Sequence, residues 1–152
     1  MAFFMSFARL NLIQGNLDKA IYWNNRVLKV GNAKVRKDIH RHAQLVSMIL
    51  YYETWEVGKL ENRYRAVVRS FSKEELTLEY ERIVLEMLNG LPRLTTKAEV
   101  QKNFKELLER MQALEANPGE RKAQGFNFIK SWLEAKVSKQ ELRVIFEAQL
   151  EG

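Results

Sequence analysis

The sequence predicts an all-α protein built from antiparallel helical hairpins. Apolar residues recur at three- and four-residue steps in one segment after another, and this spacing places them on one face of a helix. Helix-start signals separate several of these segments, and no stretch alternates apolar and polar residues long enough to indicate a sheet. The 152 residues include only two prolines, which favours uninterrupted helices.

The apolar periodicity divides the chain into a series of helices. In the third of them, Ile39, Ala43, Val46 and Leu50 share one face. Most connections are only a few residues long, which makes neighbouring helices antiparallel. The predicted helices span 2–14, 17–30, 33–54, 57–71, 73–89, 97–115, 118–136 and 139–150.

Start signals mark the helices of the second half. Asn117 is followed by Pro118, whose missing N–H costs nothing at the first position of a helix. In a capping box, a hydroxyl residue accepts from a backbone N–H while a glutamate three positions later accepts from the cap's own N–H. Three such boxes are predicted, at Ser72–Glu75, Thr96–Glu99 and Ser138–Glu141, and Asn117–Glu120 is a fourth with asparagine as the cap.

A glycine corner separates the first two predicted helices. Gly15, Leu17 and Ala20 form the pattern Gly-x-Leu-x-x-Ala, in which the small alanine allows two helix axes to approach closely. The pattern resembles the tetratricopeptide repeat, and this resemblance implies hairpins stacked as an α–α superhelix. Gly58 repeats the glycine of the pattern, but Arg63 stands where an alanine would be expected.

The resemblance covers residues 1–71. Residues 73–152 are then irregular helices that cap the stack, and residues 1–152 form a single helical-hairpin domain, because no long polar linker divides them. The alternative is an irregular helical bundle, in which Gly15 and Gly58 are merely helix ends.

The charge of the chain is unevenly distributed. Residues 1–76 contain 13 Lys/Arg and 7 Asp/Glu, whereas residues 77–152 contain 12 of each, so the net charge of +6 belongs to the first half. This excess favours an acidic partner. No window approaches the roughly 20 apolar residues of a membrane-spanning helix, so no membrane partner is expected. The absence of cysteine fits a cytoplasmic location.

No pattern predicts catalysis or metal binding. His40 and His42 lie about 200° apart around a helix and cannot share an ion. His42 falls on the apolar face and is predicted to be a buried, hydrogen-bonded histidine. The serines lack a nucleophile-elbow context, and no glycine-rich phosphate loop occurs. We therefore expect no enzyme activity, no cofactor and no metal site.

A second stripe on the third predicted helix carries residue types that are enriched at protein interfaces. The resemblance implies that the first helix of each hairpin lines a concave groove for a protein or peptide. The alternative is that this stripe packs against a neighbouring hairpin, an interpretation favoured for Leu45 and Met48. The predicted partner-binding residues are Arg9, Arg41, Met48, Tyr52 and Trp55.

The sequence thus predicts a non-enzymatic scaffold for protein–protein interactions, as part of a longer protein or an assembly. Phe3, Phe4 and Phe7 open the chain within a helix that needs covering, which suggests a preceding repeat or a homodimer through this helix. The alternative function is nucleic-acid binding, for which no known motif is present. Its basic residues are Arg26, Lys29, Lys34, Arg36, Lys37 and Arg41, followed by Lys59, Arg63, Arg65, Arg69 and Lys73.

Overall fold

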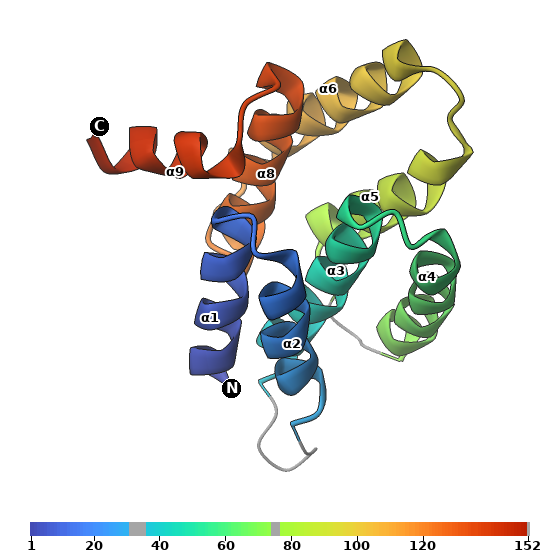
Figure 1. Ribbon diagram of the computed structural model, residues 1–152, viewed down its shortest axis with the longest axis vertical. Helices are drawn as coiled ribbons and strands as arrows, with labels where there is room; N and C mark the ends of the chain where they lie inside the picture. The colour runs from blue at the N-terminus through green and yellow to red at the C-terminus, as the bar shows by residue number, and fades with distance from the viewer. Residues whose placement is uncertain (31–35, 74–76, 152) are drawn as a thin grey trace. The chain divides into compact units, whose positions relative to one another are not determined.

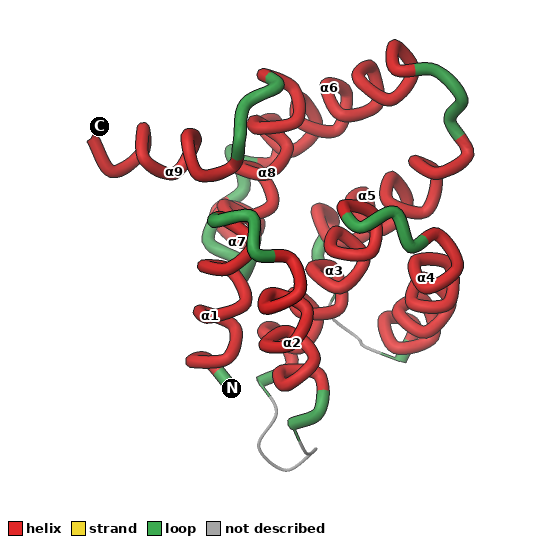
Figure 2. Tube along the Cα trace, in the orientation of Figure 1, coloured by secondary structure: helices red, strands yellow, loops and turns green. Residues whose placement is uncertain are grey.

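The computed structural model describes residues 1–30, 36–73 and 77–151, and the predicted all-α fold is confirmed over these ranges. The described residues form helices joined by turns and contain no strand (Figure 1, Figure 2). The chain divides into two compact units, Met1–Thr77 and Leu78–Gly152, which are described separately. That the two units form one domain stays a prediction.

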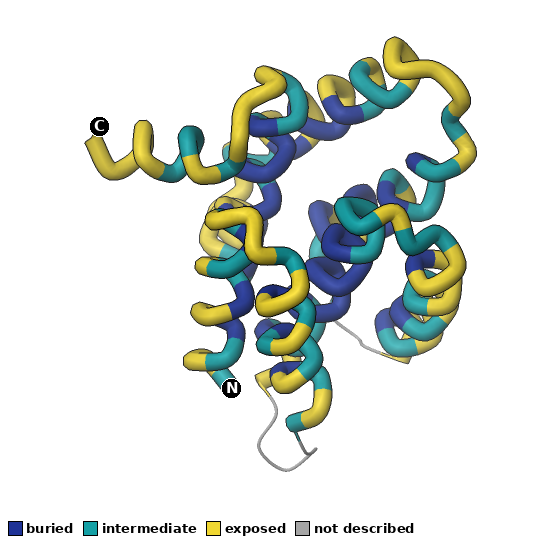
Figure 3. Tube along the Cα trace, viewed as in Figure 1, coloured by how far each residue is buried: buried dark blue, intermediate teal, exposed yellow. Residues whose placement is uncertain are grey.

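The first unit contains four long helices in chain order. They are α1 (Ala2–Ile13), α2 (Leu17–Leu28), α3 (Lys37–Glu53) and α4 (Val57–Ser72), and each packs against the next. The start of the third predicted helix, residues 33–35, lies outside the described residues. In Figure 3, α3 is buried along most of its length, and every residue from His42 to Leu50 is buried.

The turns α1–α2 and α3–α4 have the same backbone geometry. After α1, the amide of Gly15 donates to the carbonyl of Leu12, and the amide of Asn16 donates to that of Asn11. After α3, Trp55 and Glu56 donate to Tyr52 and Tyr51 in the same pattern. Both turns are Schellman motifs, with a left-handed residue, Gly15 (φ 80°) or Trp55 (φ 56°), just beyond the helix.

The residue that corresponds to Gly15 is therefore Trp55, and the predicted match with Gly58 is wrong. Gly58 lies in the first turn of α4. The two hairpins correspond with an offset of 40 residues, so that Leu60, and not Arg63, takes the place of Ala20. The core repeats at the same offset, because both members of each of these pairs are buried: Met5 and Leu45, Ala8 and Met48, Ala20 and Leu60, and Val27 and Val67.

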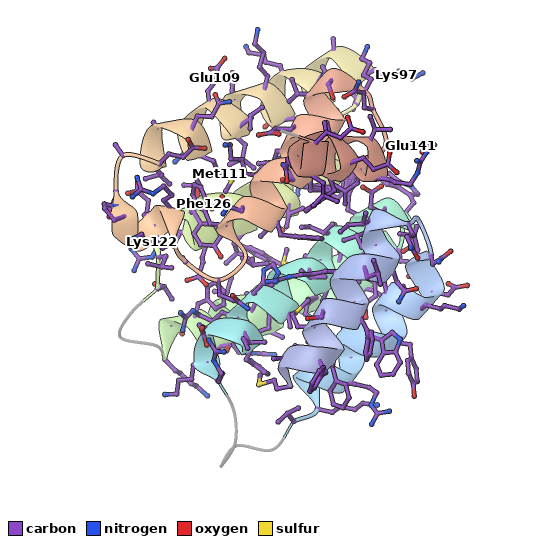
Figure 4. All side chains as sticks on the ribbon, turned by 90° about the vertical axis from the view of Figure 1, so that its left-hand side faces the viewer. Lys97, Glu109, Met111, Lys122, Phe126 and Glu141 are labelled. Atoms are coloured by element: carbon purple, nitrogen blue, oxygen red, sulfur yellow. The ribbon has the colours of Figure 1, made fainter. Side chains whose placement is uncertain are left out.

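The helices of the second unit pack around an apolar core. Its elements are α5 (Glu79–Gly90), the 3₁₀ turn η2 (Leu91–Arg93), α6 (Lys97–Leu114), α7 (Pro118–Arg121), α8 (Phe126–Ser138) and α9 (Leu142–Glu151). Helix α8 contacts α6 and α9, and α5 contacts α6. Figure 4 labels Met111 and Phe126, which are fully buried, and Lys97 and Glu109, which are exposed.

The structure confirms some predicted helix starts and corrects others. The Thr96 hydroxyl accepts from the amide of Glu99, as predicted, while the Glu99 carboxylate accepts from Thr95. The predicted start at Ser138 is wrong, because Ser138 is the last residue of α8 and its hydroxyl donates to the carbonyl of Glu134. The predicted start at Ser72 is wrong as well, because Ser72 is the last residue of α4, its hydroxyl donates to the carbonyl of Arg69, and the next described helix begins at Glu79. Residues 74–75 of that box lie outside the described residues.

The predicted helix 118–136 is divided into α7 and α8. Helix α7 ends at Arg121, and α8 begins after Gly125, which adopts a left-handed conformation (φ 86°) as the N-cap of α8. Within α7, Glu120 is buried, and its carboxylate accepts from the amide of Glu79 at 2.7 Å and from that of Tyr80 at 3.5 Å. The side chain of one helix therefore caps the N-terminus of another.

Candidate functional site

The predicted partner-binding residues occupy three places in the first unit. Arg9 lies on α1, and Arg41, Met48 and Tyr52 lie on α3. Trp55 lies in the turn that follows α3. Tyr52 and Trp55 contact each other, with ring centroids 6.0 Å apart.

Arg9 points toward the interior of the first unit. Its Nε donates to Nε2 of the buried His42 at 3.1 Å, so this imidazole nitrogen is unprotonated. Burial, and then the positive charge of Arg9, hold the pKa of His42 well below its ordinary value of 6.5. The pair joins α1 to α3 and accounts for the hydrogen bond that the sequence predicted for His42.

Met48 is fully buried, at the centre of the covered part of α3. Toward the two ends of α3 the residues are more exposed, and Arg41 and Tyr52 are both half-buried. Eleven residues of helix separate them, a distance of about 16 Å along the axis. The part of the predicted set that can meet a partner together is therefore the pair Tyr52 and Trp55.

Trp55 combines two unusual properties. Its side chain is 61% exposed, and its backbone has the left-handed conformation that a bulky residue rarely adopts. The ring leans on Tyr52 with an interplanar angle of 57°. Burial, followed by the charge of Glu53, raises the pKa of the Tyr52 hydroxyl, which stays neutral and can donate a hydrogen bond.

Polar contacts hold the turn around Trp55. The Thr54 hydroxyl donates to the carbonyl of Leu50 at 2.9 Å and lies 2.9 Å from the Glu56 carboxylate. Lys59 pairs with Glu56 at 2.9 Å, and its ammonium lies 5.9 Å from the centre of the Tyr51 ring. We define the Trp55 surface as the side chains of Tyr51, Tyr52, Trp55 and Lys59. It offers aromatic faces beside a cation.

A second exposed aromatic group lies on α1 and α2. Phe7 and Phe4 contact Trp23 at centroid distances of 4.9 and 5.9 Å, and the Arg26 guanidinium lies 4.6 Å above the Phe4 ring. Tyr22 is exposed beside them and accepts a hydrogen bond from Arg26. The sequence predicted that the phenylalanines of α1 need covering, but it did not predict that Trp23 lies beside them. The position of Trp23 on α2, the next helix, is the feature that could have indicated it.

The comparisons with known proteins add no assignment. No family model, no curated protein and no solved structure matches this chain. Among the described residues, no three metal-ligating side chains gather into a group that could hold an ion. No described helix is both long and apolar enough to cross a membrane.

Proposed function

We propose that the protein is a non-enzymatic interaction module that binds a partner protein through the Trp55 surface. The observation that carries this proposal is the exposed, left-handed Trp55. A tryptophan at an interface can bury about 150–250 Å² and is the residue type most enriched among binding hot spots. An exposed tryptophan on a rigid turn is suited to insert into a pocket of a partner.

The backbone conformation at Trp55 supports a role for this residue other than stabilising the free protein. A left-handed conformation costs a non-glycine residue roughly 1–2 kcal/mol, and the matching turn after α1 avoids this cost with Gly15. Exposure means that the tryptophan recovers only part of the cost by packing on Tyr52. Partner binding explains why a large aromatic side chain occupies a position that favours glycine.

The charge of the first unit favours an acidic partner. The net charge of +6 belongs to residues 1–77, although Lys59 on the Trp55 surface itself is paired with Glu56. A positive surface raises the rate of association with an acidic partner, and the rate then falls as salt is added.

The architecture that we propose is a stack of tetratricopeptide-like hairpins in the cytoplasm, in which the partner binds at a turn. The equal geometry of the two turns and the repeated core of α1–α2 and α3–α4 support a repeating hairpin. The 40-residue offset is longer than the 34 residues of a tetratricopeptide repeat, which places the hairpins outside the regular form of that repeat.

A capture experiment tests the proposal. Wild-type protein, Trp55→Gly and Leu150→Ser are immobilised, and the proteins each retains are identified and quantified. Leu150 on α9 is an 88% exposed apolar residue and is the matched control. We expect one protein to be retained by the wild type and the control and to fall about ten-fold or more with Trp55→Gly. Equal retention by all three would exclude the Trp55 surface.

A second candidate function is nucleic-acid binding by α4. Arg65 and Arg69 are exposed, lie four residues apart on one face, and form no ion pair with a described carboxylate. Cations at this spacing can contact successive phosphates. Binding to a single-stranded oligonucleotide that weakens steeply with salt, and that is reduced by Arg65→Gln and Arg69→Gln together, would favour this function.

A further inference from the structure

The exposed face of α1 has a covered counterpart in the second hairpin. Three large apolar side chains of α1 are exposed: Phe3 at 78%, Phe7 at 43% and Leu10 at 49%. We call them the α1 stripe. The 40-residue offset between the two hairpins relates them to Ala43, Ser47 and Leu50 of α3, and all three of these are buried.

A helix covers this counterpart in the first unit. Asn24 of α2 donates its side-chain amide to the carbonyl of Ala43 at 2.9 Å. Ile21, Asn24 and Asn25 of α2 line a narrow crevice with Ser47 and Leu50 of α3. The face of α3 that matches the α1 stripe is thus the face that receives the preceding helix.

We infer that the α1 stripe is the docking face for an amphipathic helix of a partner protein, which takes the place on α1 that α2 takes on α3. The composition of α1 supports this inference. Arg9 is its single charged residue, and the rest of its sequence is apolar or uncharged around the whole circumference. A helix with so few polar residues on its exposed side is typical of a covered position.

The sizes of the side chains define the partner's stripe. On α3 the docking face has the small residues Ala43 and Ser47, and α2 brings the larger Ile21 against them. On α1 the corresponding positions are phenylalanines. Because helix axes pack 8–10 Å apart, a helix that docks on phenylalanines needs small residues opposite them, so the partner stripe should be rich in alanine.

The charges around the α1 stripe define the partner's flanks. Arg26 lies over the Phe4 ring at the edge of the stripe and is exposed, and no described carboxylate pairs with it. A glutamate on the docking helix can reach this guanidinium. The net charge of +6 on residues 1–77 also favours a negatively charged partner.

A second copy of this chain fits the α1 stripe poorly. Pairing α1 with α1 would bring two Arg26 side chains and two basic units together. In a head-to-tail arrangement α4 would dock, and the 40-residue offset places Glu61 and Arg65 where α2 has Ile21 and Asn25. Both charged side chains would then face phenylalanine and lose part of their hydration, which disfavours this arrangement.

The test uses two synthetic helical peptides of about four turns. Both have the same stripe of alanine and leucine, and the flanking residues are glutamates in one and lysines in the other. Isothermal titration calorimetry measures their affinity for the wild-type protein, Leu10→Ser and Leu150→Ser. The two substitutions make the same change at an exposed leucine, on α1 and on α9 respectively.

The glutamate peptide should bind the wild type and Leu150→Ser with equal affinity. Its affinity for Leu10→Ser should be about ten-fold lower. The lysine peptide should bind at least ten-fold more weakly than the glutamate peptide. Circular dichroism checks the fold, and if Leu10→Ser unfolds, the more exposed Phe3→Ser takes its place.

Three results would overturn the inference. They are no binding of the glutamate peptide, equal binding of both peptides, and a wild-type dimer in analytical ultracentrifugation that Leu10→Ser dissociates, since a second copy would then cover the stripe. The inference does not rest on the Trp55 surface, so Trp55→Gly should leave peptide binding unchanged. Loss of partner capture by Trp55→Gly and loss of peptide binding by Leu10→Ser are separate results.

Discussion

Trp55 occupies in the second hairpin the left-handed position that Gly15 occupies in the first. A methyl group added at Gly15 would have no atom within 4 Å, so any cost of Gly15→Ala comes from the backbone. We expect Gly15→Ala to lower the free energy of unfolding by about 1 kcal/mol. Urea denaturation measures this change.

Position 55 should show the same preference for glycine over alanine. Trp55→Ala and Trp55→Gly both remove the indole and its contact with Tyr52, and they differ only in the cost of the left-handed backbone. We expect Trp55→Gly to be more stable than Trp55→Ala by about 1 kcal/mol. If alanine is equal or better at position 55, the strain assigned to this turn is wrong.

Glu120 should stabilise the second unit by capping α5. Glu120→Ala leaves the amide of Glu79 without its acceptor, and we expect the free energy of unfolding to fall by about 1–3 kcal/mol. Glu109→Ala, at an exposed position of α6, is the control and should change the stability by less than about 0.5 kcal/mol. Thermal denaturation distinguishes the two, and equal losses would argue against a capping role.

His42 should make the protein sensitive to acid. Its pKa in the folded state is well below 6.5, so below pH 6.5 the unfolded chain binds a proton that the folded chain does not. Stability is therefore fully present above pH 6.5 and is lost as the pH falls, by up to about 1.4 kcal/mol per pH unit.

A conservative substitution of His42 tests the pH dependence. His42→Gln keeps an acceptor for Arg9 but removes the titration, and it should flatten the stability profile between pH 7 and the pKa of the folded state. A profile that His42→Gln does not change would place the acid sensitivity elsewhere.

Ala20 should be intolerant of larger side chains. It is fully buried where α1 and α2 cross, whereas the matching residue of the second hairpin is Leu60. Ala20→Leu adds three carbon atoms to a closely packed site, and we expect it to cost about 1–3 kcal/mol. An unchanged midpoint in urea would mean that the first hairpin does not need a small residue at its crossing.

The sequence predicted where both turns lie, but it matched the second turn to the first through the wrong residue, for one physical reason. Gly15 is a residue that favours the left-handed conformation, so its presence indicates the turn. Trp55 does not favour this conformation, and Gly58 three residues later offered a more conventional but incorrect corner. The offset of 40 residues became apparent only from the hydrogen bonds of the two turns.

The second half of the chain shows what local patterns leave open. Glu120 follows Asn117 by three positions and fits a capping box, yet its carboxylate accepts from α5, 41 residues away in the chain. Ser138 fits a helix start, but its hydroxyl donates backward to Glu134 at a helix end. A motif predicts which groups can bond, and the packing of the helices selects the partner.

The candidate site was predictable in part. Arg9, Met48 and Trp55 are all residue types that are common at interfaces. The sequence favoured packing within the protein for Met48, which is confirmed, but it offered no means of separating Arg9 from Trp55. The structure places Met48 in the interior, directs Arg9 to His42 and leaves Trp55 exposed. The buried acceptor His42, which determines the direction of Arg9, lies 33 residues away.

The most direct test of the proposed function is ¹⁹F NMR of protein labelled with 5-fluorotryptophan. The chain has three tryptophans, Trp23 beside the α1 stripe, Trp55 in the exposed turn and Trp132 in the core of the second unit, so each resonance reports a different region. On addition of the partner found by capture, the resonance of Trp55 should shift while that of Trp132 stays in place. A Trp55 resonance that is unchanged when the partner is saturating would contradict binding through the Trp55 surface.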